Sequence, residues 1–278
     1  MPTETYQKKL ERHMESYRKA RLGLPPGACG TFTYRKVTKP RGHILPPGLK
    51  WLNIPEPFRQ EVREHVQANS RITLHKYFHH LNSSQALALA LFYPYSKNAP
   101  TALAKALGSA AIEELEFELV PDKSERTSVD VSWSDGRSRT HCEVKLSEAV
   151  FGPAAVDKAP RGYYEHKLAN RYAPVLGPYV AEELLTPTRF FKDYQILRNL
   201  WLAARSGHEK DQILFLLPKA NNGPNEQLER LLPLVRPALR KRIRAIHLEE
   251  LLDRLAADRT PGGLSWYGEV LREKYVPA

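Results

Sequence analysis

Two short strand-like runs separated by a tight turn constrain the fold of this chain most strongly. Residues 128–133 and 141–146 form the runs, and the Ser-Asp-Gly-Arg sequence at 134–137 lies between them. This pattern predicts a β-hairpin. Because side chains alternate along a strand, Glu143 and Lys145 point to one face and Val144 to the other. With Asp130 on the other arm, the hairpin gathers two carboxylates and one amine.

These three side chains have the chemistry of a cation site. Hard divalent cations prefer oxygen ligands, so Asp130 and Glu143 suit such an ion. The amine of Lys145 then adds a positive charge beside a water that the ion activates. A solvated strand edge carries the same residue types, so the pattern alone leaves that alternative open.

The flanking sequence predicts the order of the other elements. Upstream we expect a helix with Ser83 or Ser84 as its N-cap that ends near Pro94, a second helix over 99–114 and a strand over 115–121. Downstream we expect, in order, a helix over 187–206, a strand over 212–218, a helix over 225–239, a strand over 242–248 and a helix from 249. The apolar run 212–218 is typical of a strand buried on both faces. Together these elements predict an α/β fold with a mixed central sheet flanked by helices.

The hairpin resembles the core of the PD-(D/E)XK nuclease superfamily, which carries an Asp on one strand and a Glu-x-Lys on the next. Here Glu143-Val144-Lys145 begins thirteen positions after Asp130, and Val129 stands where the family name has proline. The Ser-Ser-Gln-Ala helix start at 83–86, the Phe-Glu at 117–118 and the Thr-Ser-Val-Asp at 127–130 look like a bacterial restriction-endonuclease-like group of that superfamily. The resemblance covers roughly residues 70 to 255. It implies a restriction-endonuclease-like core.

The resemblance also implies an activity and a set of metal ligands. The expected protein is a Mg²⁺-dependent DNA endonuclease of restriction or phage-defence type, with Mn²⁺ as a substitute metal. Asp130, Glu143 and the backbone carbonyl of Val144 are the expected ligands. Lys145 is expected to orient or deprotonate the attacking water and to stabilise charge on the phosphate.

Three further positions are candidates for the site. Superfamily members often add a fourth acid ahead of the hairpin, and we favour Glu118 over Glu114 and Glu116, with Gln85 as a neutral alternative. Gln195 and Arg198 follow on the next helix, three positions apart, so they share a face that could meet the phosphate. A solvent-exposed role is the alternative for each of these residues.

The charge of the chain favours a polyanionic partner. The net charge is +11, and basic residues gather near 35–41, in the segment 151–178 and near 236–244. We expect the segment 151–178 to be a loop that contacts double-stranded DNA through phosphates, using Lys158, Arg161, Lys167 and Arg171, while Tyr163 and Tyr164 could stack on bases. Solvated basic surface is the alternative interpretation.

Residues 1–70 are expected to form an N-terminal extension, and residues 71–278 the nuclease-like core. Within the extension we expect an amphipathic helix over 4–22, a short strand over 31–37 and a helix over 57–68. This region could pack on the core, grip DNA or mediate dimerisation. The sequence does not choose among these roles.

The remaining sequence features limit the location, the structural metal and the oligomeric state that we expect. No apolar run approaches the length of a membrane span and no signal-peptide core is present, so we expect a cytoplasmic protein with no membrane partner. The two cysteines lack C-x-x-C spacing, which argues against structural zinc. A homodimer is expected if both DNA strands are cut. Two other functions stay open: a nucleic-acid-binding protein that does not cut, and a nuclease acting on RNA or on single-stranded or branched DNA.

Overall fold

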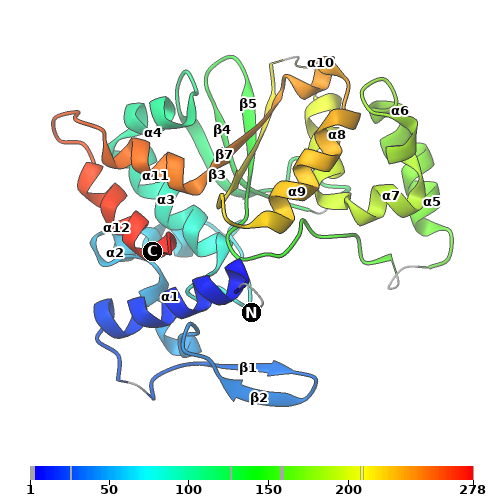
Figure 1. Ribbon diagram of the computed structural model, residues 1–278. Coiled ribbons are helices and arrows are strands. Elements are labelled where there is room, and N and C mark those ends of the chain that lie inside the picture. The colour runs from blue at the N-terminus through cyan, green and yellow to red at the C-terminus, as the bar shows by residue number, and fades with distance from the viewer. Residues whose placement is uncertain are drawn as a thin grey trace.

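A five-stranded mixed sheet lies at the centre of the protein (Figure 1), and the computed structural model describes residues 4–25, 27–125, 127–156, 160–206, 208 and 210–277. The strands run in the order β3 (Glu113–Leu119), β4 (Val129–Ser134), β5 (Arg139–Val144), β6 (Gln212–Leu217) and β7 (Ile243–His247). β3, β4 and β5 pair antiparallel, whereas β5, β6 and β7 pair parallel. The predicted α/β class, hairpin and mixed sheet are confirmed.

Helices cover both faces of this sheet (Figure 1). On one face, Val131, Cys142 and Leu216 enter a core formed with α3 (Ser84–Asn98), α4 (Pro100–Leu107), α11 (Leu248–Ala256) and α12 (Ser265–Tyr275). On the other face, Ile213 and Phe215 enter a second core formed with α7 (Pro187–Lys192) and α8 (Tyr194–Arg205). The burial of β6 between these two layers explains its continuous apolar sequence.

The helix boundaries differ from the predicted ones for local reasons. Ser83 caps α3, as predicted, with its hydroxyl accepting the Ala86 N–H at 3.3 Å, but the helix continues past Pro94 to Asn98. α4 ends at Leu107 instead of 114, because Gly108 adopts the left-handed conformation that terminates many helices. β3 therefore begins at Glu113, two residues earlier than predicted.

The predicted loop 151–178 is wrong for its second half. That part contains α5 (Tyr163–Lys167), a π-helical turn (Leu168–Tyr172) and α6 (Ala173–Leu176). The predicted helix 187–206 is two helices that meet at Asp193. The predicted helix 225–239 is divided into α9 (Asn222–Leu231), a short 3-10 turn (Leu232–Leu234) and α10 (Pro237–Arg240). Two prolines in that stretch lack the N–H group that a continuous helix needs.

The N-terminal residues form α1 (Tyr6–Arg21), a hairpin of β1 (Thr31–Tyr34) and β2 (Val37–Pro40), a 3-10 segment (Pro47–Asn53) and α2 (Glu56–Ala68). The hairpin replaces the single strand expected over 31–37. Leu10 and Met14 of α1 are buried in the same core as α12, and the buried Lys274 of α12 donates to the side chain of Asn53 at 2.8 Å. The domain boundary near residue 70 stays a prediction.

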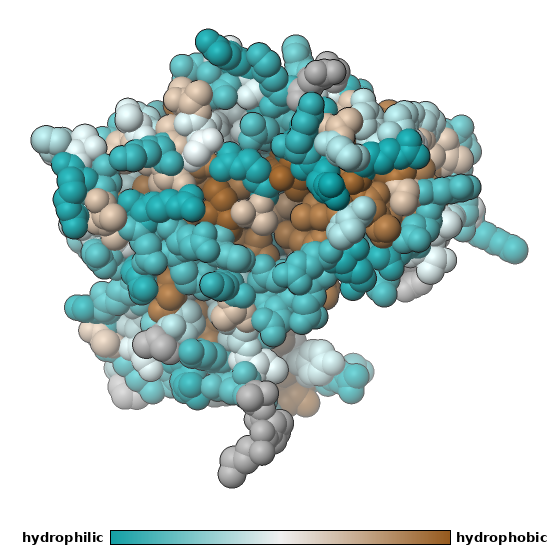
Figure 2. All heavy atoms as spheres, turned by 45° about the horizontal axis from the view of Figure 1, so that its top comes forward, coloured by the Kyte–Doolittle hydropathy of each residue, from teal (hydrophilic) through white to brown (hydrophobic). Residues whose placement is uncertain are grey.

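Two surface features complete the description. Hydrophilic side chains dominate the face shown in Figure 2, and apolar side chains show in a hollow across its middle. Within the described ranges, none of the helices has the length and apolar character needed to cross a membrane.

Candidate active site

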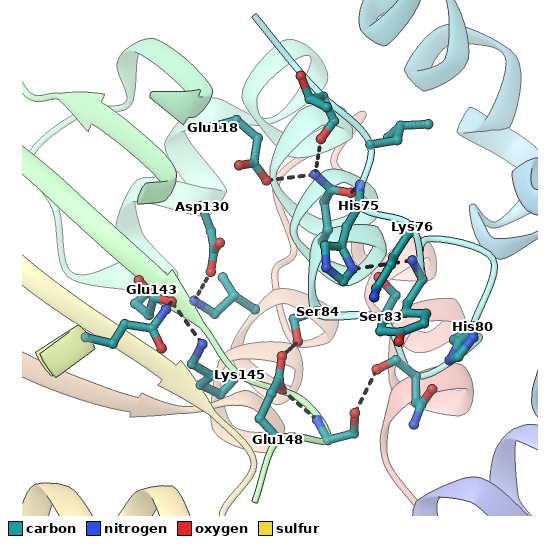
Figure 3. Close-up of a pocket in the computed structure, with 18 residues that line it drawn as sticks. His75, Lys76, His80, Ser83, Ser84, Glu118, Asp130, Glu143, Lys145 and Glu148 are labelled. Carbon is teal, nitrogen blue, oxygen red and sulfur yellow. Dashed lines mark hydrogen bonds and ion pairs between the residues drawn. The ribbon is translucent and has the colours of Figure 1, made fainter. Parts of the chain in front are cut away.

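The carboxylates of Asp130 and Glu143 and the ammonium of Lys145 line one cavity of about 820 Å³ (Figure 3). β4 and β5 position them. The last paired residues of these two strands are Val131 and Cys142, and continuing the register by one step sets Asp130 opposite Glu143. At that step the Asp130 carboxylate accepts the backbone N–H of Val144 at 2.7 Å. The structure therefore brings together the three residues of the predicted motif.

The Glu143 carboxylate contacts the side chains of Lys145, Gln195, Asn199 and Arg198. Its Oε1 lies 3.0 Å from Lys145 Nζ and also accepts a hydrogen bond from the Gln195 amide. Its Oε2 accepts from Asn199 at 3.0 Å and lies 3.5 Å from an Arg198 nitrogen. Burial by itself would raise the pKa of Glu143, but the positive charges of Lys145 and Arg198 outweigh burial and lower it. The carboxylate is therefore ionised.

Lys145 is a cation in this arrangement. Burial alone would lower the pKa of Lys145, but the adjacent Glu143 carboxylate raises it above its usual value. The ammonium also lies 5.6 Å from the centre of the Phe151 ring. It is thus suited to stabilise negative charge, whereas action as a base would first require the loss of a proton, which the adjacent Glu143 carboxylate disfavours.

Asp130 has the opposite electrostatic balance. Burial and the nearby Glu143 carboxylate raise the pKa of Asp130 well above its usual value, and Lys145 and the Val144 N–H offset only part of this effect. Two close carboxylates with one of them disfavoured as an anion form a site that an added cation would stabilise.

The donor set fits Mg²⁺. No group of three or more Asp, Glu, His or Cys side chains that could hold a metal exists among the residues described. Mg²⁺ commonly takes one or two carboxylates and completes its octahedron with waters and substrate phosphate. Asp130, Glu143 and the Val144 carbonyl supply that number of hard oxygen donors. Coordination by Glu143 Oε1 would compete with Lys145 and Gln195 for the same atom.

Glu118 lines the same cavity from β3. Its two oxygens accept from Gln85 and from Ser128, both at 2.7 Å. Its backbone φ of +51° is unusual for a residue with a side chain, and such strained positions cluster at functional sites. The other two acids that we weighed pair elsewhere: Glu114 and Glu116 bind Arg139 at 2.8 and 3.1 Å.

Sequence reasoning missed two other members of the site. Asn199 lies one turn after Gln195 on α8, and its i, i+4 spacing could have identified it as a third residue on the same face as Gln195 and Arg198. Glu148 follows β5, lines the cavity, and accepts from the Ser84 hydroxyl and from the backbone N–H of Leu146 at 2.9 Å. No sequence signal pointed to Glu148.

The wall opposite the hairpin was also missed. It comes from the segment before α3, and Figure 3 shows His75, Lys76 and His80 across from Asp130 and Lys145. The Lys76 ammonium lies 4.6 Å from the ring centre of Tyr77, which lines the cavity as well. One side of the cavity is therefore acidic and the other is basic and aromatic.

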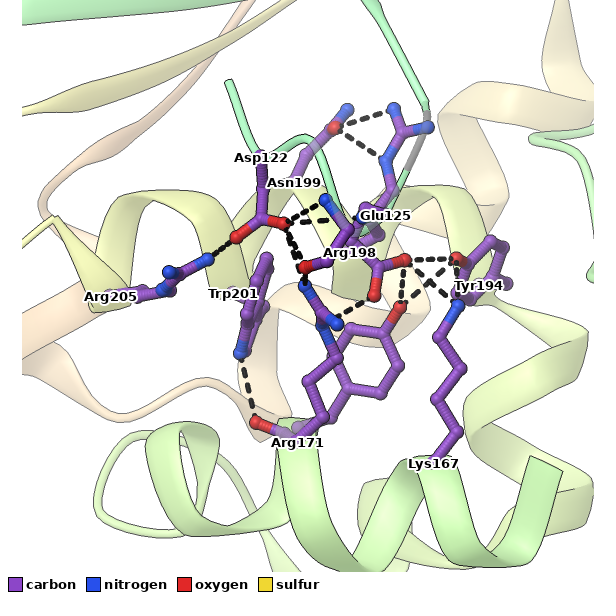
Figure 4. Close-up of polar contacts among 11 residues, drawn as sticks. Asp122, Glu125, Lys167, Arg171, Tyr194, Arg198, Asn199, Trp201 and Arg205 are labelled. Carbon is purple, nitrogen blue, oxygen red and sulfur yellow. Dashed lines mark hydrogen bonds and ion pairs between the residues drawn. The ribbon is translucent and has the colours of Figure 1, made fainter. Parts of the chain in front are cut away.

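The structure places the predicted phosphate-binding residues in different environments. Lys158 lies outside the described residues, and Arg161 is exposed. Lys167 and Arg171 enter a network of ion pairs (Figure 4), with Lys167 2.9 Å from Glu125 and Arg171 2.7 Å from Asp122. Their role in binding nucleic acid stays a prediction, and these ion pairs weigh against it. Arg198 is buried against Glu143 and Asn199.

The model of the family described as restriction endonuclease associating with ARP matches residues 11–276, nearly the whole chain. No curated protein and no solved structure matches the chain.

Proposed function

The chain belongs to the family of restriction endonucleases associating with ARP, and from that premise we propose that it is a Mg²⁺-dependent endonuclease that hydrolyses phosphodiester bonds in double-stranded DNA. Family membership supports a nuclease role. The observation that carries the finer proposal is the meeting of Asp130, Glu143 and Lys145 in one cavity. An Asp on β4 and a Glu-x-Lys that begins on β5 and ends just after it also support assignment to the PD-(D/E)XK pattern, and we propose a restriction or phage-defence role.

Each residue has a part in the proposed reaction. Asp130, Glu143 and the Val144 carbonyl would hold Mg²⁺, or Mn²⁺ in its place. The ion would polarise the phosphate and lower the pKa of a bound water. Lys145 places a positive charge where the phosphate gains negative charge in the transition state. Gln195 and Asn199 hold the Glu143 carboxylate in position. Glu118 is the candidate fourth acid, and its bonds to Gln85 and Ser128 fix its carboxylate at the cavity.

A panel of substrates tests this proposal. Supercoiled plasmid, linear duplex, single-stranded DNA and RNA are incubated with the protein in Mg²⁺ or in EDTA, with Asp130→Asn protein as the matched control. We expect Mg²⁺-dependent cutting of duplex DNA by the wild type only. Cutting of RNA alone or of single-stranded DNA alone would mean that the protein is a nuclease for that substrate and not for duplex DNA. Binding in EDTA without cutting in Mg²⁺ or Mn²⁺ would show a non-catalytic protein.

A further inference from the structure

The positive charge of this chain is concentrated outside the candidate active site. Residues 16–55 contain eight Lys or Arg residues and no Asp or Glu, so they account for eight of the eleven net positive charges. The β1–β2 hairpin lies in this stretch, carries three of the eight cations (Arg35, Lys36 and Lys39) and stands apart from the central sheet (Figure 1). At its distal end, Tyr34 and Val37 are 62% and 54% exposed. The hairpin is therefore a charged and accessible projection.

The turn of the hairpin carries its charges at a conformational cost. Arg35 and Lys36 connect the two strands and have backbone φ values of +46° and +66°. A two-residue turn with both residues at positive φ strongly favours Asn-Gly, because side chains are strained in that conformation. Here two long cationic side chains occupy these positions. A sequence selected only for hairpin stability would not place them there, which points to a role for the charges.

The hairpin cations lack an acidic partner within the part of the chain that the structure describes. Among the described residues no ion pair reaches Arg35, Lys36, Lys39 or Arg41, and the Arg35 guanidinium instead lies 5.2 Å from the Tyr34 ring centre. Lys167 and Arg171, by contrast, are paired with acids. The charges of the hairpin are thus available to an anionic ligand.

The base of the hairpin is fixed to the body of the protein. Arg18 of α1 is only 1% exposed and donates to the backbone carbonyls of Gly42 and Ala28 at 2.8 and 3.1 Å. The Leu45 N–H, just after the hairpin, donates to the His79 carbonyl at 3.0 Å. The hairpin therefore has a rigid connection to the segment that forms one wall of the cavity.

One face of the hairpin continues that wall. Phe32 pairs with Lys39, and Tyr34 pairs with Val37, so these four side chains share a face. The Phe32 ring centre lies 6.1 Å from the ring centres of both Tyr77 and His80, which line the cavity. A basic and aromatic surface thus runs from the cavity to the tip of the hairpin.

We propose that the β1–β2 hairpin is an arm that binds the phosphate backbone of duplex DNA while the scissile strand lies in the cavity. The proposal rests on the proposed nuclease function, and it adds a binding site for the substrate outside the acidic centre. The unpaired cations give charge complementarity to phosphates, and the rigid base gives a defined position relative to the cavity. A two-stranded β-ribbon also has dimensions that fit along a DNA groove.

The first test reverses the charge at the tip. Binding of a fluorescein-labelled duplex is measured by anisotropy in EDTA over a series of salt concentrations. Arg240, the last residue of α10, and Lys241, which follows it, form an exposed Arg-Lys pair at the opposite end of Figure 1 and supply a control with the same charge change. We expect Arg35→Glu/Lys36→Glu to weaken binding at least about tenfold and to make the salt slope shallower by about two. Equal losses in Arg240→Glu/Lys241→Glu would overturn the proposal, because bulk charge would then explain both.

The second test separates a binding role from a structural one. Arg35→Asn/Lys36→Gly installs the preferred turn sequence, so the melting temperature should stay the same or rise while duplex binding weakens. Unchanged duplex binding in this variant would contradict the proposed role of the hairpin as a DNA-binding arm. Stronger loss of binding to anionic lipid vesicles than to the duplex would point to a membrane surface and also overturn the proposal.

These tests are independent of cleavage. Loss of duplex binding in the tip variants would support the arm even if wild-type protein failed to cut any substrate in Mg²⁺. Conversely, tip variants that cut DNA in Mg²⁺ and bind the duplex as tightly as the wild type would support the nuclease function and contradict the proposed role of the hairpin.

Discussion

The ammonium of Lys145, the residue just after β5, lies 3.0 Å from Oε1 of Glu143, two positions earlier in the chain. Without a metal, this ion pair satisfies the Glu143 carboxylate and keeps Lys145 charged. A metal bound to the same oxygen would displace the ammonium from it and leave Lys145 free to approach the phosphate. In the proposed mechanism, metal binding and the placement of the Lys145 ammonium would therefore be coupled through the Glu143 carboxylate.

Asp130→Asn should stabilise the metal-free protein and remove its response to Mg²⁺. The pKa of Asp130 is raised by burial and by Glu143, so the ionised carboxylate costs stability. By linkage, the wild-type free energy of unfolding should fall as pH rises from the usual Asp pKa of 3.8 through the raised value, and the variant should lack this fall. Urea unfolding in EDTA across that range measures it. A variant less stable than wild type at neutral pH would contradict the electrostatic account.

Asn199→Ala should slow cleavage without weakening DNA binding. Asn199 donates a hydrogen bond to Glu143 at 3.0 Å and is itself buried, so it positions the carboxylate that we propose as a metal ligand. Loss of such a partner typically costs about 10- to 100-fold in activity or metal affinity. Steady-state kinetics should show a lower kcat, and calorimetry should show weaker Mn²⁺ binding. A change confined to KM would indicate a different role.

Glu125→Gln should destabilise the fold by about 3 kcal/mol. The Glu125 carboxylate is buried and accepts from Lys167 at 2.9 Å and from the Tyr172 hydroxyl at 2.5 Å (Figure 4). Removing its charge leaves the cations around it uncompensated. Urea unfolding measures the loss, and Glu165→Gln, at an exposed acid on α5, is the control. Equal stability of the two variants would mean that the network contributes little.

Stability should also depend on His80 in mildly acidic solution. Burial lowers the pKa of His80 to about 4, with help from the neighbouring imidazoles of His79 and His43. The unfolded chain then binds a proton that the folded protein excludes, so stability should fall as pH drops from 6.5 toward 4. His80→Gln should reduce this fall by roughly 1 to 2 kcal/mol, because the ring is partly exposed and solvent screens part of the effect. Identical pH profiles for wild type and variant would show that His80 does not contribute.

The centre of the site could be predicted because its parts are close in sequence. Asp130, Glu143 and Lys145 belong to one hairpin, and strand alternation alone sets which side chains share a face. The wall formed by Lys76 and His80 comes from a segment that precedes α3, and only tertiary packing brings it opposite. No local pattern encodes that contact.

Two other predictions from the sequence, the loop over 151–178 and the single strand over 31–37, were wrong for physical reasons. The short helices α5 and α6 are too brief to form on their own, and the contacts of Lys167 with Glu125 on another segment help to hold them. The β1–β2 turn uses Arg-Lys in place of Asn-Gly, so it carries no standard hairpin signal. The sequence therefore predicted one strand where the chain forms two.

The most direct test of the account is single-turnover cleavage of a duplex by Lys145→Ala protein at saturating enzyme, in Mg²⁺. Lys76→Ala, which removes another lysine from the same cavity, is the control, and saturation removes effects on binding. We predict that Lys145→Ala slows cleavage by about 100-fold or more while Lys76→Ala stays near the wild-type rate. Cleavage by Lys145→Ala at the wild-type rate would contradict the assignment of this cavity as the active site.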